Sequence, residues 1–258
     1  MNIHPTAIIA KKAKIDESAK IGPYSIIGDE VEIGKGTEIG AHCQVTGKTT
    51  IGQGCRIFPG AIIGSIPQDL KFKGEKSSLV IGDDNIIREY TTINLGTGDG
   101  GKTIVGSRNL IMAYSHIAHD CNVGSECVIA NCGTLADHVI IEDKAIIGGL
   151  VAIHQFSRIG KLSIVGGCSK VVQDIPPYST CDGHPTKVYG LNLIGLKRAG
   201  VSSKILLELK RAFKVLFFSS LTTASAVERI KKEIPKSEYL THLVEFVAAS
   251  SRGVCKNK

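Results

Sequence analysis

The stretch that decides the fold runs from Val105 to Val171 and reads VGSRNL IMAYSH IAHDCN VGSECV IANCGT LADHVI IEDKAI IGGLVA IHQFSR IGKLSI VGGCSK V. Every sixth residue in it is Ile, Leu or Val. The same register extends back to Ile3, and 26 of its 29 positions between residues 3 and 171 are Ile, Leu or Val. An ordinary composition would place these residues at about a quarter of the positions, so the period indicates a repeat architecture.

The three exceptions to the period are Asp69, Glu75 and Asp99, and they fall in two polar stretches. The repeat resumes in phase after each stretch. We therefore predict loops inserted near residues 64–80 and 94–104.

Two other positions of the repeat have a character of their own. The residue after the aliphatic is often Gly, which suits a corner where the chain turns sharply. The fourth residue after it is often Ala, Ser, Thr or Cys, which suits the inside of a narrow tube. We therefore interpret half of the eight cysteines as packing residues, and no cysteine pair has C-x-x-C spacing.

Six residues are enough for one short strand and a bend, which is the unit of a parallel β-helix whose coils stack to share a core. The pattern resembles that of the hexapeptide-repeat transferases. That resemblance implies three hexads per coil and a left-handed winding. The predicted fold is therefore an all-β left-handed parallel β-helix.

The period ends after Val172, and apolar residues then recur at helical spacing. The first predicted helix begins at Ser203 behind Ser202 as its cap. Two more helical stretches are expected at about residues 222–234 and 237–250. The β-helix is thus followed by a small C-terminal α-helical domain.

The two predicted domains, residues 1–190 and 191–258, differ in charge. The second contains 13 Lys and Arg against 5 Asp and Glu, a net charge of +8, whereas the first has 18 and 19. The helical domain is expected to attract an acidic partner, and a solvated basic face is the alternative. Nucleic acid is disfavoured because no DNA- or RNA-binding module is recognisable.

Targeting signals are not evident. No uncharged apolar run approaches the roughly 20 residues that cross a bilayer, so no transmembrane segment is expected. The basic residues near the N-terminus follow the apolar stretch, which is the reverse of a secretory signal. We therefore expect a cytoplasmic protein with reduced cysteines.

With 18 residues per coil, polar residues far apart in the sequence fall above one another. Several are histidines at outward positions, which makes a buried core histidine the weaker interpretation and leaves plain surface histidines as the alternative. Histidine can remove and return a hydroxyl proton near its unperturbed pKa of about 6.5, and a neighbouring carboxylate fixes its tautomer. We predict an acid–base site with His119, Asp137 and Gln155 in one column, Asp120 and His138 in the next, and His116 and His154 beside them.

In a further pair of columns the side chains become smaller toward the C-terminal coils. This pattern is explained either by corner geometry or by a groove long enough for an extended apolar chain. The columns are Met112, Ala130, Gly148 and Gly166, and Ala113, Asn131, Gly149 and Gly167.

Several motifs resemble the UDP-N-acetylglucosamine O-acyltransferase family of lipid A biosynthesis over nearly the whole chain. They are H-I-A-H-D-C from His116, L-A-D-H-V, I-H-Q-F, V-G-G-C-S, Q-D-I-P-P-Y and N-L-I-G-L-K-R. The resemblance implies transfer of an (R)-3-hydroxyacyl group from acyl carrier protein to the 3-hydroxyl of UDP-N-acetylglucosamine, the first step of lipid A biosynthesis. It also implies a homotrimer with sites between subunits, and neither a metal nor another cofactor. An acidic carrier protein fits the basic helical domain.

The resemblance implies a role for each matching residue. His119 matches the general base, Asp120 orients it, and the backbone N–H of Asp137 matches the oxyanion donor. The substrate-binding matches are His116, His138, His154, Gln155, Asn192 and Arg198 for the nucleotide sugar, Asp69 and Lys71 for a closing loop, and Gly167 for the end of the acyl groove. Because Gly167 leaves that groove open, we predict a long acyl chain, about 12 to 16 carbons for three or four coils spaced roughly 4.8 Å apart.

Three positions depart from the family pattern. Asp137 stands where Gly is frequent, Ile194 replaces the acidic residue of N-L-E-G-L-K-R, and Asn94-Leu95 replaces His followed by Arg or Lys. The change at Ile194 leaves open a 3-amino sugar as acceptor, with an amide product.

Three further alternatives remain. One is the sister UDP-3-O-acylglucosamine N-acyltransferase, which the tail and I-H-Q-F fit less well. A zinc hydratase would require three converging histidine nitrogens. A solenoid that only binds a partner would not require gathered histidines.

Overall fold

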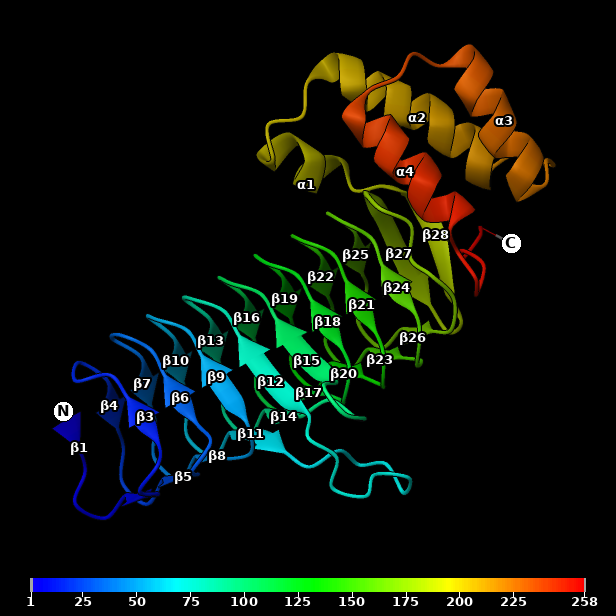
Figure 1. Cartoon of the computed structure of the whole chain (residues 1–258). Helices are drawn as coiled ribbons and strands as arrows, with labels where there is room; N and C mark the ends of the chain where they lie inside the picture. The colour runs from blue at the N-terminus through cyan, green and yellow to red at the C-terminus, as the bar shows by residue number, and fades with distance from the viewer. Residues whose placement is uncertain (1, 258) are drawn as a thin grey trace.

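The computed structural model describes residues 2–257, and its main body is a three-sided stack of coils with helices at one end (Figure 1). All pairs of neighbouring coils are joined by parallel strands. The first sheet contains β1 (Asn2–Ile3), β4 (Lys20–Ile21), β7 (Glu38–Ile39), β10 (Arg56–Ile57), β13 (Ile86–Ile87), β16 (Leu110–Ile111), β19 (Val128–Ile129), β22 (Ile146–Ile147), β25 (Ile164–Val165) and the closing hairpin β27 (Ser179–Gly183) and β28 (Thr186–Leu191).

Two further sheets form the other sides. One contains β2 (Ile8–Ile9), β5 (Ile26–Ile27), β8 (Gln44–Val45), β11 (Ile62–Ser65), β14 (Thr92–Asn94), β17 (His116–Ile117), β20 (Thr134–Leu135), β23 (Ala152–Ile153) and β26 (Lys170–Val171). The other contains β3 (Lys14–Ile15), β6 (Glu32–Ile33), β9 (Thr49–Ile51), β12 (Ser78–Ile81), β15 (Lys102–Val105), β18 (Asn122–Val123), β21 (Ile140–Ile141) and β24 (Arg158–Ile159).

The register of these sheets confirms three hexads per coil. Asn122 lies opposite Ile140, which lies opposite Arg158, so each coil advances the chain by 18 residues. At the two insertions the spacing grows: Ile62 pairs with Thr92 and Thr92 with His116. These spacings exceed 18 by two hexads and by one hexad, which is why the aliphatic register survives both loops.

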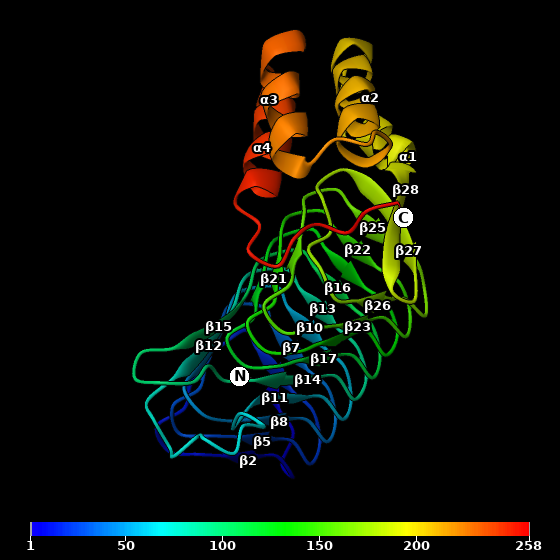
Figure 2. The ribbon, with the colours of Figure 1, turned by 90° about the vertical axis from the view of Figure 1, so that its right-hand side faces the viewer.

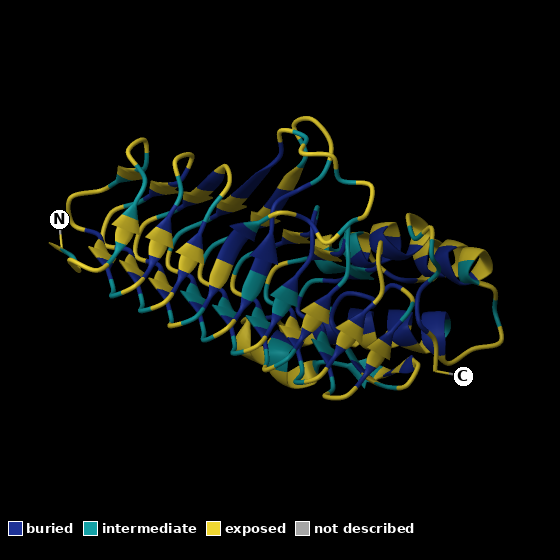
Figure 3. Cartoon of the chain, turned by 90° about the horizontal axis from the view of Figure 1, so that it is seen from below, coloured by how far each residue is buried: buried dark blue, intermediate teal, exposed yellow. Residues whose placement is uncertain are grey.

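The interior is built from the predicted positions. Most two-residue strands pair an exposed residue with a buried one (Figure 3), and the buried one is the repeating aliphatic. The small residues four positions later are buried as well, among them four cysteines that are at most 1% exposed. Burial raises the pKa of Cys121 to about 12 and that of Cys127 to about 11, so these thiols stay protonated. The four packing cysteines are Cys43, Cys55, Cys121 and Cys127.

The glycine after the aliphatic serves a different purpose from the sharp turn that we expected. The left-handed backbone conformation usually lies two residues after this glycine, for example at Arg108 (φ 58°), Glu126 (φ 60°) and Leu150 (φ 59°), and Gly64 (φ 73°) is an exception. A Cβ on Gly34 would instead lie 2.7 Å from the backbone of Gly52 in the next coil. Glycine is therefore required there because neighbouring coils approach closely.

The C-terminal helices lie beyond the last coils (Figures 1 and 2). They are α1 (Leu193–Arg198), α2 (Ser203–Phe217), α3 (Thr223–Glu233) and α4 (Glu238–Ala248). The last three correspond to predicted helices, and the Ser202 side chain accepts the N–H of Ile205 as expected of a cap. The short helix α1 was not predicted. The predicted division at residue 191 falls at the end of β28.

The segment after α4 returns across the end of the β-helix (Figure 2). Its backbone pairs with Asp174, which accepts the N–H of Cys255 and donates its own N–H to the carbonyl of Gly253. In the part of the chain that the structure describes, no helix combines the length and apolar content needed to span a bilayer.

Replacing Gly34 by Ala should lower the free energy of unfolding by about 1–3 kcal/mol, because the new methyl group would overlap the backbone of the next coil. Thermal denaturation followed by circular dichroism measures the effect. Gly149→Ala is the matched control, since its Cβ would meet nothing nearer than the Asn131 carbonyl oxygen at 3.4 Å. Equal melting temperatures for the two variants would contradict the close-approach explanation.

Candidate active site

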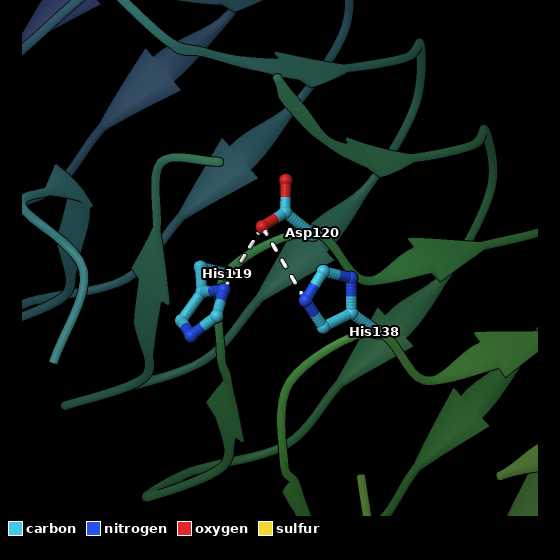
Figure 4. Close-up of side chains that lie close together, drawn as sticks. All are labelled: His119, Asp120 and His138. Atoms are coloured by element: carbon cyan, nitrogen blue, oxygen red, sulfur yellow. Dashed lines mark hydrogen bonds and ion pairs between the residues drawn. The ribbon is translucent and has the colours of Figure 1, made fainter. Parts of the chain in front are cut away.

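His119, Asp120 and His138 form a compact group at one corner of the β-helix (Figure 4). The first two follow β17 and the third follows β20 on the next coil, where its N–H donates to the carbonyl of His119 at 3.1 Å. His119 Nδ1 lies 2.9 Å from Asp120 Oδ2, and His138 Nε2 lies 3.9 Å from the same oxygen. The 18-residue spacing therefore brings together the residues that the sequence predicted to be neighbours.

The Asp120 carboxylate is held by more donors than His119 alone. Thr97, in the loop after β14, donates its hydroxyl to Oδ2 at 2.5 Å and its N–H to both oxygens at 3.1 Å. Burial by itself would raise the pKa of Asp120, but the hydrogen bonds from Thr97 and His119 outweigh it and hold the pKa below its ordinary value. Asp120 is thus ionised at neutral pH.

An ionised Asp120 determines where the proton sits on His119. The carboxylate can only accept, so it takes the Nδ1–H of the imidazole and leaves Nε2 with a free lone pair. Nε2 makes no hydrogen bond to any described residue, and the side chain of His119 is only 8% exposed. This arrangement suits a general base whose tautomer is fixed by a partly buried carboxylate.

The rings of His138 and His116 each have a defined partner. The ring of His138 stacks on Phe156 at a centroid distance of 4.7 Å and meets His119 edge-on at 5.4 Å. His116, on β17, lies 2.7 Å from the Thr92 hydroxyl through Nδ1. Burial lowers the pKa of His116, so its ring is neutral at neutral pH.

Asp137 occupies the column between His119 and Gln155. Its carbonyl accepts the N–H of Phe156 at 3.0 Å, which places the three residues on successive coils. Among residues 2–257, no acceptor binds the backbone N–H of Asp137 and no donor binds its carboxylate. A free backbone donor is therefore present one coil above His119.

Four of the predicted substrate contacts lie away from this group within a single chain. Asn192 caps α1, accepting the Gly195 N–H at 2.9 Å, and also donates to the Leu162 carbonyl. Arg198 is exposed in the last turn of α1. In the first inserted loop, residues 66–77, Asp69 accepts the N–H of Lys71. No hydrogen bond or ion pair joins any of these four residues to His119, Asp120 or His138 within the described chain.

The two inserted loops are nevertheless connected. The N–H of Gly100 donates to the carbonyl of Lys76 at 2.8 Å, and Asp99 accepts the Lys76 N–H at 3.2 Å. Because Thr97 in the second loop binds Asp120, the first loop, which projects from the prism in Figure 1, is tied to the segment that covers the carboxylate.

The two glycine-containing columns differ in the space available for a Cβ atom. A Cβ on Gly148 or Gly166 would lie 2.6 Å from a neighbouring atom, so close packing requires glycine at both. At Gly149 and Gly167 the nearest contacts would be 3.4 and 3.2 Å, and neither residue has a positive φ. Packing between coils therefore does not explain glycine at position 149 and explains it only in part at position 167, which favours a groove over corner geometry at these two positions.

The side chains of His119, Asp120 and His138 are also of the types that bind metal ions. Ligand atoms of His119, Asp120 and His138 lie within 4.8 Å of one another. They comprise two imidazole nitrogens and one carboxylate oxygen, whereas the zinc-hydratase alternative requires three converging nitrogens. The arrangement fits a carboxylate–histidine pair better than that alternative.

Comparison with known proteins covers the whole chain. A model of UDP-N-acetylglucosamine O-acyltransferase, domain 2, matches residues 174–255, and a bacterial transferase hexapeptide model matches residues 12–47 and 102–137. The acyl-[acyl-carrier-protein]–UDP-N-acetylglucosamine O-acyltransferase of Anaeromyxobacter dehalogenans is 49% identical over 99% of this chain and 100% of its own length. That of Thermodesulfovibrio yellowstonii is 51% identical over 98% and 99%. The chain belongs to the UDP-N-acetylglucosamine O-acyltransferase family.

Solved structures agree with this assignment. The LpxA of Acinetobacter baumannii superposes with a TM-score of 0.96 at 42% identity, covering 98% of this chain and 99% of its own. The LpxA of Bacteroides fragilis gives 0.95 at 41% identity, with the same coverage. The predicted fold class, a left-handed parallel β-helix followed by helices, is thereby confirmed, as is the prediction of an acyltransferase.

Two departures from the family pattern have different structural settings. Asn94 is 2% exposed and donates to the Ser65 hydroxyl at 2.8 Å and the Ile66 carbonyl at 3.0 Å, and Leu95 is also buried. This pair therefore fixes the base of the first loop. Ile194 is 66% exposed on α1, where it is free to meet a ligand or a second subunit.

The contacts of Asp120 that the sequence analysis missed come from loop residues outside the repeat. Replacing Thr97 by Val should raise the pKa of Asp120 toward its ordinary value, because the hydroxyl donor is lost while the backbone N–H remains. A pH titration of the labelled carboxyl group by NMR measures the change. Thr134→Val is the control, since its hydroxyl binds only the Cys132 carbonyl. An unchanged Asp120 titration in T97V would refute the assigned cause.

Proposed function

We propose that this acyltransferase moves an (R)-3-hydroxyacyl group from acyl carrier protein to the 3-hydroxyl of UDP-N-acetylglucosamine, the first step of lipid A biosynthesis. The observation that carries the proposal is the 2.9 Å contact between His119 Nδ1 and an ionised Asp120. It leaves Nε2 as the basic atom in a family whose named members carry out this reaction.

In the proposed mechanism, His119 Nε2 removes the proton of the sugar hydroxyl as its oxygen attacks the thioester carbonyl carbon. The oxyanion of the tetrahedral intermediate accepts the free N–H of Asp137. When the intermediate collapses, the C–S bond breaks and the imidazolium returns its proton to the thiolate of the carrier. Asp120 stabilises the imidazolium between these steps.

The nucleotide sugar is proposed to lie along the outer column of histidines. His116, His138, His154 and Gln155 would contact it from this chain. Asn192 and Arg198 on α1, and Asp69 and Lys71 in the first loop, form no hydrogen bond or ion pair with the histidine group within the described chain. This supports a homotrimer in which each site is completed by a neighbouring subunit.

Exposed apolar side chains give further support to such an assembly. Tyr90 and Tyr114 stack at 5.2 Å along one corner of the β-helix, where they are 56% and 61% exposed. Leu150 continues the same corner and is 63% exposed. A contiguous apolar strip of this kind is typical of a surface that a partner covers.

The acidic carrier protein is proposed to dock on the helical domain, where the positive charge is concentrated. The proposed partners do not include nucleic acid. A cytoplasmic location is part of the proposal, because eight free cysteines are typical of a reducing compartment.

The acceptor can be tested directly. With a 3-hydroxyacyl carrier protein as donor, the purified enzyme should acylate UDP-N-acetylglucosamine faster than its 3-amino analogue, because His119 is placed to deprotonate a hydroxyl. Mass spectrometry of the products under competition measures the preference. Faster reaction of the amino sugar would instead make Ile194 a determinant of N-acylation.

His119→Ala is the control for this experiment. It should reduce transfer by at least about a thousandfold, since the base is lost, while oligomeric state and melting temperature stay unchanged. Residual transfer close to that of the native enzyme would remove the proposed mechanism.

The groove makes a second prediction. The native enzyme should prefer acyl chains of about 12 to 16 carbons, a length that matches three or four coils at roughly 4.8 Å each. Gly167→Leu should shift the preference to shorter chains, because the open end of the groove is filled. Transfer rates over a series of acyl carrier proteins measure both, with Thr50→Leu, at an exposed position on β9 in the N-terminal coils, as control. A native preference for ten carbons or fewer, or no shift in G167L, would contradict the assignment of the groove.

A further inference from the structure

The C-terminal segment places an arginine against the histidine column. Arg252 Nη2 lies 3.2 Å from His154 Nδ1, and its Nε and Nη2 donate to the carbonyl of Val172 at 3.4 Å. The two side chains in contact are 98 residues apart in the sequence. Neither the hexapeptide period nor the helical pattern extends to residue 252.

The residues that flank Arg252 in the sequence are anchored to Asp174. Ser250 donates its hydroxyl to Asp174 Oδ2 at 2.7 Å, and Gly253 and Cys255 pair with the Asp174 backbone. Asp174 is only 1% exposed, and its other oxygen accepts the N–H of Arg158 on β24 at 2.8 Å. The guanidinium is thus presented by a segment anchored to the last coils and not by a free tail.

The contact determines which nitrogen of His154 carries the proton. Nδ1 lies 3.2 Å from Arg252 Nη2 and also 3.2 Å from the carbonyl oxygen of Gln155. A guanidinium only donates and a carbonyl only accepts, so one neutral ring cannot satisfy both. With Arg252, Nδ1 must be the acceptor and Nε2 carries the hydrogen; with the Gln155 carbonyl, the tautomer is reversed.

We propose that Arg252 is a positioning residue that holds His154 in the Nε2–H tautomer, so that the outer nitrogen donates a hydrogen bond to an anionic oxygen of the nucleotide diphosphate. The inference rests on the proposed function, in which His154 contacts the nucleotide sugar. Without Arg252, Nδ1–H turns to the Gln155 carbonyl and Nε2 presents a lone pair to the phosphate oxygen. The guanidinium also adds a positive charge beside the same ligand.

The predicted effect is on binding of the sugar nucleotide and not on the chemical step. Arg252→Ala should raise KM for UDP-N-acetylglucosamine about tenfold to a hundredfold, the usual loss for a hydrogen bond to a charged group. kcat should stay within about twofold, because no described contact joins Arg252 to His119 or Asp120. Arg252→Lys, which retains the charge and a donor, should recover part of the loss.

Ring nitrogen chemical shifts from 15N-histidine NMR report the tautomer without any assay of activity. The His154 signals, assigned with His154→Gln, should show Nε2–H in the native protein and a shift toward Nδ1–H in R252A. Lys256→Ala is the matched control: it removes one positive charge from the same segment, its exposed side chain makes no contact with His154, and KM for the sugar nucleotide and the ring signals should not change.

Three results would overturn the inference: an Nδ1–H tautomer in the native protein, identical His154 signals in R252A, or a fall in kcat with KM unchanged. The first needs only the His154 assignment and no Arg252 variant, so it is decisive even if R252A does not fold. If the native enzyme transfers no acyl group, the proposed function fails, whereas the NMR comparison still decides whether Arg252 selects the tautomer.

Discussion

The stacking of coils in 18-residue register is the constraint on which every other feature depends. Each coil hydrogen-bonds to the next through short parallel strands, so a residue at a corner has its counterpart directly above it at the strand spacing of about 4.8 Å. A shift of this register by one residue would turn the aliphatic side chains outward, and it would also separate the residues of each column. Close approach between coils also excludes a methyl group at positions such as Gly34, so the sequence tolerates little change there.

The candidate site uses this register in two ways. His119 and Asp137 belong to one column, and Asp120 and His138 to the next, because the corner repeats. Both inserted loops add whole hexads, which lets the chain extend a cover over Asp120 without displacing the columns below it. The coils thus set the position of His119, the proposed base, and an irregular loop supplies the donors that keep the Asp120 carboxylate ionised.

Periodicity predicted the parts of the molecule that repeat. The columns around His119, the burial of Cys121 and the helix behind Ser202 follow from spacing and from cap chemistry. Thr97 and Arg252 lie in a loop and a tail without a period, and their contacts depend on three-dimensional closure that no local pattern encodes. A glycine follows many of the aliphatics, and the expectation that it forms a sharp turn was largely wrong, because sequence alone does not distinguish a positive φ from a close approach.

An aspartate is compatible with the proposed role of position 137, where the family often has Gly. The proposed oxyanion donor is a backbone N–H, which any residue other than Pro provides, and φ at this position is not in the left-handed region. The side chain is partly exposed and forms no ion pair in the described chain, so water screens its charge. The proton of His119 is controlled by Asp120, whose contacts do not include Asp137. The two aspartates therefore have different roles in the proposed mechanism: Asp120 acts through its carboxylate as the partner of His119, and Asp137 acts through its backbone N–H.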